Sequence, residues 1–212
     1  MSTGGPGLVI AEEHLRRAGR LAERGRALLG ITGAPGAGKS TLAGALLAGL
    51  RVRGVPAALV GMDGFHIADR ALRELGLEPV KGAPETFDVA GYVALLRRLR
   101  DPSERVVWAP EFRRDIDDAI QSSVPIGPEV DLVVTEGNYL LLDGPWRPVR
   151  DLLDEVWYVD VPAESRRARL AARHELYGRS QAQAWERTLG SDERNARTVA
   201  VTRELADLVI TL

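Results

Sequence analysis

Cysteine is absent from the 212-residue chain, and histidine is scarce. The lack of cysteine excludes disulfide bonds, thiolate metal sites and a cysteine nucleophile, and it fits a reducing compartment. The three histidines, His14, His66 and His174, are scattered along the sequence. Because a zinc site needs several ligands in one place, we expect no zinc site.

An excess of one charge and a long apolar run are also missing. Lysine and arginine number 28 against 30 aspartates and glutamates, so the net charge is -2 and the basic excess typical of nucleic-acid binders is absent. No window holds the run of about 18 apolar residues that a membrane span needs. The first ten residues lack the basic start and apolar run of a signal peptide. We therefore expect a cytoplasmic protein with no nucleic-acid or membrane partner.

Lysine is rare, while the rest of the composition is that of an ordinary globular protein. Only Lys39 and Lys81 are lysines among the 28 basic residues, so the position of each is informative. The chain is 45% hydrophobic and 27% charged, which argues against disorder or a coiled-coil rod. We predict one domain over residues 1–212, with residues 1–7 as a mobile tail.

Short apolar runs without polar alternation recur along the chain, as in strands buried on both faces. Segments with helical spacing separate them, as in residues 15–22, 89–100 and 163–177. This alternation predicts an α/β fold with a parallel sheet between two layers of helices. The loop-like segments 76–87 and 121–129 are expected to line a ligand crevice. The predicted strands cover residues 27–31, 57–62, 106–109, 132–135, 156–159 and 208–210.

Residues 33–40 read GAPGAGKS, the phosphate-binding pattern of glycine, four residues and glycine-lysine-serine. Its glycines let backbone N–H groups point into one concavity, and the following helix adds the positive end of its dipole. Lys39 would then reach the β- and γ-phosphates, and the Ser40 hydroxyl would bind Mg²⁺. The loop alone does not distinguish a GTPase, a motor or a small-molecule kinase. The predicted nucleotide-binding residues here are Gly33, Ala34, Pro35, Gly36, Ala37, Gly38, Lys39, Ser40 and Thr41.

Two carboxylates follow predicted strands, Asp63 in MDGFH and Glu136 in VVTEG. Because the carboxyl ends of parallel strands converge on one crevice, both could flank the transferred phosphoryl group. We assign Glu136 to Mg²⁺ together with Ser40, and Asp63 to the acceptor hydroxyl, whose proton it would take or orient. The alternative for either carboxylate is to cap a turn.

An arginine-rich helix is predicted near the C-terminus. Arg166, Arg169 and Arg173 are spaced three and four residues apart, so they share one helical face. This face could belong to a lid over residues 163–190 that closes over ATP and stabilises phosphate charge. It could equally be a solvated surface.

Several motifs in order resemble one known family. GAPGAGKS, MDGFH, KGAPETFD, APEF, VVTEGNYLL and RHELYGRS together resemble the uridine kinase, type I pantothenate kinase and phosphoribulokinase group of P-loop kinases. The resemblance implies a five-stranded parallel sheet of order 2-3-1-4-5 and an arginine-bearing lid. It also implies transfer of the ATP γ-phosphate to a hydroxyl of a small metabolite with Mg²⁺, with Asp63 facing that hydroxyl and Glu136 near the metal. A homodimer is a further implication.

Within the group, the segments KGAPETFD and APEF look more like pantothenate kinase than uridine kinase. Uridine kinases carry an aspartate and a histidine where this chain has Gly82 and Ala83, and a histidine of the pantothenate kinases is replaced near Arg114. With SDERNA at 191–196, the chain most resembles a branch described as nucleoside/nucleotide kinase-like or fructose-transport kinase-like. In that branch Asp192 and Asn195 could border the nucleotide base, whereas the alternative is that Ser191 or Asp192 caps a helix.

The candidate residues around the acceptor come mainly from the loops. Lys81 could meet an anionic acceptor or could be a solvated loop lysine, and His66 is expected to donate or accept a hydrogen bond rather than bind a metal. The candidates for acceptor binding are Asp63, His66, Lys81, Phe87, Arg114, Glu136 and Tyr139.

These residues predict an ATP-dependent kinase that phosphorylates a hydroxyl of a nucleoside, a pantothenate-like molecule or a sugar. Its catalytic residues would be Asp63, Lys39, Arg169 and Arg173, with Arg166 and Arg169 also contacting the nucleotide. The alternative is a nucleotide-binding switch or ATPase without a metabolite acceptor. A GTPase switch should show a guanine-reading Asn-Lys-x-Asp segment, which the sequence lacks. A mononucleotide kinase is a third option.

Overall fold

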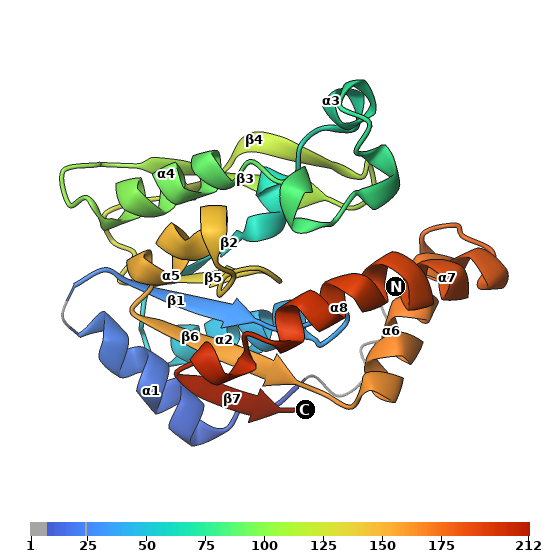
Figure 1. Ribbon diagram of the computed structural model, residues 1–212. Coiled ribbons are helices and arrows are strands. Elements are labelled where there is room, and N and C mark those ends of the chain that lie inside the picture. The colour runs from blue at the N-terminus through green and yellow to red at the C-terminus, as the bar shows by residue number, and fades with distance from the viewer. Residues whose placement is uncertain (1–7, 24) are drawn as a thin grey trace.

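A computed structural model describes residues 8–23 and 25–212 of the chain. The predicted tail, residues 1–7, lies outside these described residues. The chain forms one parallel sheet between two layers of helices, with a two-stranded hairpin beside it (Figure 1). None of the described helices is long and apolar enough to cross a membrane.

Five parallel strands form the central sheet in the order β2-β5-β1-β6-β7. Counted only within this sheet, the order is 2-3-1-4-5, so the expected topology is confirmed. All six residues of the middle strand are buried, as a run without polar alternation predicts. The strands are β1 (Ala27–Thr32), β2 (Ala57–Gly61), β5 (Leu132–Glu136), β6 (Glu155–Asp160) and β7 (Leu208–Thr211).

Each face of the sheet has its own hydrophobic core, because successive side chains of a strand point to opposite faces. Leu29 packs with residues of α1 (Glu12–Ala22) and α2 (Lys39–Val52) on one face. Leu28 packs on the other face with residues of α4 (Val89–Arg100), α5 (Arg147–Leu152) and α8 (Glu193–Ala200).

The hairpin corrects two predictions. Residues 106–109 were expected to form a strand of the parallel sheet and 121–129 a loop. Instead β3 (Val107–Arg113) and β4 (Asp118–Ile126) pair antiparallel in a separate sheet. Only one face of β3 is covered, since Val107 is buried while Trp108 is 51% exposed. The apolar run was too short to reveal this alternation, and the proline and glycine at 125–128 hid the end of a strand.

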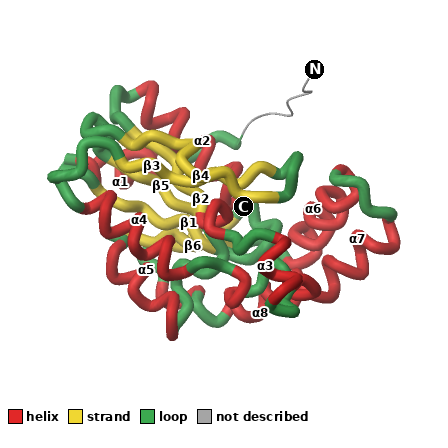
Figure 2. Tube along the Cα trace, turned by 90° about the horizontal axis from the view of Figure 1, so that it is seen from above, coloured by secondary structure: helices red, strands yellow, loops and turns green. Residues whose placement is uncertain are grey.

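The segment predicted to form a lid contains α6 (Ala163–Leu176), α7 (Gln181–Arg187) and a π-helical turn (Thr188–Asp192) that leads directly into α8. Figure 2 shows α6 and α7 side by side at one end of the molecule. Because the chain is already helical before α8, neither Ser191 nor Asp192 makes a side-chain cap there. The capping alternative for these two residues is therefore wrong. Two 3-10 turns (Glu78–Val80 and Pro84–Thr86) lie within the predicted loop 76–87, and the short helix α3 (Asp69–Glu74) precedes that loop.

Candidate active site

The glycine-rich loop connects β1 to α2, as its motif requires. Lys39 is 8% exposed, and its ammonium donates to the carbonyls of Gly33 at 3.0 Å and Ala34 at 3.1 Å. Burial lowers the pKa of Lys39 to about 8, although Glu136 and then Asp63 oppose the shift. A cation held without a bonded carboxylate can exchange its carbonyl partners for phosphate oxygens.

Gly36 explains how the lid helix reaches the phosphate loop. Its φ is +79°, and a Cβ there would lie 2.7 Å from the Leu170 side chain and 2.9 Å from the Arg166 carbonyl oxygen. Only glycine fits this backbone and this contact with α6. The first turns of the lid helix are therefore packed directly on the nucleotide loop.

Ser40 and Glu136 meet at the start of α2. The Ser40 hydroxyl donates to Glu136 Oε1 at 2.9 Å, so the pair predicted from the sequence is in direct contact. Burial raises the pKa of Glu136, and the nearby charge of Asp63 raises it further. A hydroxyl and a carboxylate are oxygen ligands of the kind that Mg²⁺ prefers, so these residues fit such an ion.

Asp63 lies directly after β2, in the 3-10 turn η1 (Met62–Phe65). Arg114, from the turn of the hairpin, donates to Asp63 Oδ2 at 3.3 Å. The His66 ring lies 2.8 Å from the Asp63 carbonyl oxygen and packs at a tilt against Phe87 and Phe112, with ring centroids 4.1 and 4.9 Å away. The hairpin therefore supplies part of the site, although the sequence did not predict it as a hairpin.

Asn138 was missed in the sequence. It follows the strand that carries Glu136, and its Oδ1 accepts a 2.7 Å hydrogen bond from Lys39. The backbone of Asn138 is fixed in turn by the Thr32 hydroxyl, which donates to its carbonyl at 3.1 Å. A polar side chain two residues after Glu136, at the carboxyl end of a strand, was the signal that could have found it.

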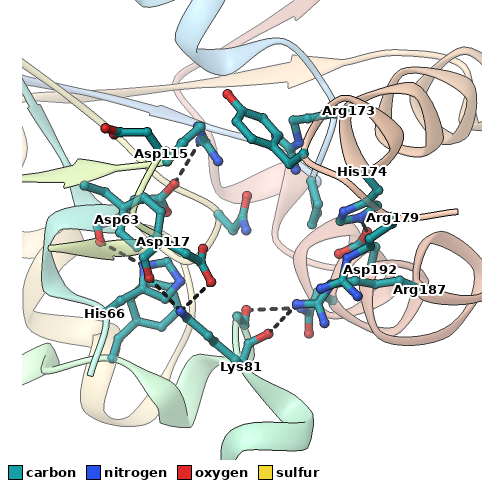
Figure 3. Close-up of a pocket in the computed structure, with 18 residues that line it drawn as sticks. Asp63, His66, Lys81, Asp115, Asp117, Arg173, His174, Arg179, Arg187 and Asp192 are labelled. Atoms are coloured by element: carbon teal, nitrogen blue, oxygen red, sulfur yellow. Dashed lines mark hydrogen bonds and ion pairs between the residues drawn. The ribbon is translucent and has the colours of Figure 1, made fainter. Parts of the chain in front are cut away.

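Two adjoining cavities occupy the carboxyl edge of the sheet. One, of about 340 Å³, is lined by the phosphate loop, and the other, of about 420 Å³, lies between the hairpin and the lid. Figure 3 shows the second cavity, with Asp63 and the hairpin carboxylates facing the lid arginines. Both cavities are lined by Pro35, Asp63, Arg114, Asn138 and Arg173.

The predicted nucleotide residues divide into those that line the first cavity and those that support it. Pro35, Gly36, Gly38, Lys39, Ser40 and Thr41 line this cavity. Ala37 is instead buried in the core, and Gly33 and Ala34 hold Lys39 through their carbonyls.

The three lid arginines do not share one environment. Arg166 is 4% exposed, pairs with Glu193 and donates weakly to the Pro35 carbonyl at 3.5 Å. Arg169 lines only the first cavity, at the phosphate loop, and Arg173 lines both cavities. The alternative of a solvated face is therefore wrong for Arg166 and Arg173, and the buried pair of Arg166 makes it a support of the loop.

Lys81 is neither a solvated loop lysine nor a free cation. Its ammonium pairs with Asp69 at 2.6 Å and with Asp117 at 2.9 Å. Burial disfavours the charge of Lys81, but the hydrogen bonds to Asp117 and Asp69 outweigh burial and raise its pKa. Lys81 thus ties the hairpin turn to α3 at the wall of the second cavity.

Tyr139 and Asn195 both reach the carbonyl of Gly82. The Tyr139 hydroxyl donates to it at 2.5 Å and the Asn195 amide at 3.1 Å. Tyr139 is fully buried and does not line the second cavity, so it stabilises the loop that contains Gly82. Phe87 lines the second cavity. Asn195 lines the second cavity and not the nucleotide cavity, which places it away from the phosphate loop.

Comparison with known proteins gives relatives over most of the chain. A family model described as methylmalonyl-CoA mutase-associated GTPase MeaB matches residues 8–66, which include the phosphate loop and cover less than half of the chain. A Schizosaccharomyces pombe protein named as a candidate uridine kinase is 32% identical, over 87% of this chain and 83% of that protein. The structure of a candidate fructose transport system kinase from Silicibacter sp. TM1040 superposes with a TM-score of 0.82 at 41% identity, over 89% of this chain and 91% of that one.

A pantothenate kinase of Serratia proteamaculans is 32% identical over 65% of this chain, which spans only 46% of that enzyme. Phosphoribulokinase from Rhodobacter spheroides shares the fold, with a TM-score of 0.60 at 13% identity. The chain therefore belongs to the uridine kinase, type I pantothenate kinase and phosphoribulokinase family of P-loop kinases.

Proposed function

We propose that this protein is a kinase that transfers the γ-phosphate of ATP to a hydroxyl group of a small metabolite. The observation that carries the proposal is the pair of adjoining cavities that share Asp63, Arg114 and Arg173. One cavity has the groups that bind phosphates, and the other has room for a second molecule. Phosphoryl transfer needs both substrates in line, and the shared lining is where they would meet.

The charges of the nucleotide cavity favour a polyphosphate. Lys39, Arg114, Arg169 and Arg173 line it against only Asp63 and Glu136. Lys39 would contact the β- and γ-phosphates, and Ser40 and Glu136 would hold Mg²⁺. The metal, when bound, neutralises charge on the phosphates.

Asp63 would act at the junction of the cavities. It would accept the hydroxyl proton as the hydroxyl oxygen forms a bond to the γ-phosphorus and the bond from that phosphorus to ADP breaks. Arg114 holds the Asp63 carboxylate in place, and Arg173 would stabilise the charge on the transferred group from the lid.

Mass spectrometry of reaction products tests this proposal. The protein and Mg-ATP would be incubated with pantothenate, nucleosides, mononucleotides, sugars, sugar phosphates and hydroxy acids. We expect one phosphorylated species, which should disappear with Lys39→Ala. ATP consumption without any phosphorylated acceptor would contradict the proposal and favour a nucleotide-dependent switch.

A further inference from the structure

The second cavity carries more positive charge than its carboxylates can neutralise. Four carboxylates line it, Asp63, Asp115, Asp117 and Asp192. Each already has a basic partner within 3.3 Å, which for Asp192 is His174. The carboxylates are thus occupied before any ligand binds.

Three arginines of the same cavity have no such partner. Arg173, Arg179 and Arg187 have no carboxylate oxygen within 4.0 Å among residues 8–23 and 25–212. Arg187 donates one N–H to the Lys81 carbonyl at 3.1 Å, which leaves its charge uncompensated. Guanidinium groups are cationic in proteins, so all three bring positive charge to this cavity.

Arg179 and Arg187 lie across the second cavity from Asp63 (Figure 3). Figure 3 shows Arg179 and Arg187 on the lid side, opposite Asp63 and the hairpin turn. The rings of Phe87 and Phe112 lie with His66 on the wall near Asp63. A ligand with its hydroxyl at Asp63 would therefore point its other end at the lid arginines.

Lys81 cannot supply this positive charge, because two carboxylates already hold it. Arg173 is not counted among the groups that would bind the far end of the acceptor, because it lines both cavities and lies where the transferred phosphate would be. Arg179 and Arg187 line only the second cavity.

We propose that the acceptor is an anion, a hydroxyl-bearing metabolite whose carboxylate or phosphate group is bound by Arg179 and Arg187. This inference rests on the proposed kinase activity and names the class of its second substrate. Guanidinium groups recognise both oxyanions through paired N–H donors, so carboxylates and phosphates remain the two sources of the same chemistry. A neutral acceptor would make no ion pair with Arg179 and Arg187, whereas an anionic one would pair with both.

The first test measures binding without ATP. Ligand-dependent shifts of Tm would be compared within matched pairs: glycerate with glycerol, pantothenate with pantothenol, and ribose 5-phosphate with ribose. We expect at least one acid to stabilise the protein while its uncharged analogue does not. Which acid stabilises the protein most shows whether the site prefers a carboxylate or a phosphate. If no acid stabilises the protein more than its uncharged analogue, the proposal is overturned.

The matched variants are Arg179→Gln, Arg187→Gln and Arg197→Gln. Arg197 is exposed on α8 and lines neither cavity, so it controls for the loss of one positive charge. The Arg179 side chain makes no hydrogen bond or ion pair within the described part of the chain, so its removal should not disturb folding. Each cavity variant should weaken binding of the acid about tenfold or more. Binding of the acid that is as strong in both cavity variants as in Arg197→Gln would overturn the proposal.

The second test measures phosphorylation of the same pairs with Mg-ATP. We expect Arg179→Gln and Arg187→Gln to raise KM for the acid about tenfold with little change in KM for ATP. Phosphorylation of an uncharged acceptor that is insensitive to both variants would overturn the anionic class while leaving the kinase intact. A protein that binds the acid through these arginines but phosphorylates nothing would contradict the kinase activity and leave the oxyanion site standing.

Discussion

The cavity at the phosphate loop and the second cavity, between the hairpin and the predicted lid, are built in different ways. Residues 35–41 of the phosphate loop supply half of the lining of the first, whereas the second is assembled from the hairpin, the loop before α4, the lid and α8. Phosphates have the same chemistry in every nucleotide, so a short continuous motif can bind them. An acceptor is distinguished by its shape and charge, which several separate segments must define together.

The two lysines of the chain show the same contrast. Lys39 is bonded to two carbonyls and the Asn138 side chain, and burial lowers its pKa to about 8. Lys81 is bonded to two carboxylates, and its pKa is raised. Lys39 can therefore exchange its carbonyl partners for an anion, whereas Lys81 connects the hairpin turn to α3 beside the second cavity.

The largest effect is expected at the junction of the cavities. Asp63→Asn should lower kcat for phosphoryl transfer by about 10²- to 10⁴-fold, because the amide cannot accept the hydroxyl proton. Binding of ADP, measured by calorimetry, should change little. A kcat within about tenfold of the wild type would show that Asp63 only orients the acceptor.

The two lysines provide a matched pair of substitutions. Lys39→Ala should lower kcat/KM for ATP by about 10²- to 10³-fold, because it removes a cation from the phosphate cavity. Lys81→Ala should leave ADP binding unchanged and raise KM for the acceptor, since it releases the hairpin turn. Equal loss of ADP affinity in both variants would contradict the division into two independently built cavities.

The contact between the lid and the nucleotide loop should matter for stability. Glu193 bridges Arg166 and Arg167, and the hydrogen bond from Arg167, with another from Arg166, lowers its pKa to about 2. Glu193→Gln should reduce the free energy of unfolding by about 2 kcal/mol in urea titrations, because it leaves the buried Arg166 without its counter-charge.

The sign of the pH effect follows from this lowered pKa. The stabilisation by Glu193 is fully present above the ordinary glutamate pKa and is lost as the pH falls toward 2. The difference in unfolding free energy between wild type and Glu193→Gln should therefore shrink below about pH 4.5. A difference that stays constant down to pH 3 would contradict the role of this ion pair.

The smallest effect concerns the protonation of Lys39. Since its pKa is about 8, the lysine is charged at pH 7 and mostly neutral at pH 9, so affinity for ADP should fall about tenfold over this range. Lys39→Arg keeps its charge and should show no such dependence, however weakly it binds. An identical pH profile for the two proteins would show that another group is responsible.

The sequence predicted the parallel sheet and the first cavity well, because both depend on local patterns. Buried strands show as apolar runs, and the phosphate loop is a continuous motif. The sequence-based prediction was wrong at the hairpin, because the apolar run 106–109 was interpreted as a strand buried on both faces. In the structure Trp108 is exposed between the buried Val107 and Ala109. The prediction also missed Asn138, whose role appears only when the strand ends are brought together.

The sequence by itself determined where the phosphate-loop motif lies and that Asp63 and Glu136 line the cavity beside it. These facts follow from the order of strands and loops along the chain, since parallel strands end at one edge. Only the tertiary structure decided which charges remain available. Lys81 and Arg166 are neutralised by partners far away in the sequence, whereas Arg179 and Arg187 face the cavity without one. Pairing of this kind depends on distances between side chains, which spacing along the chain does not define.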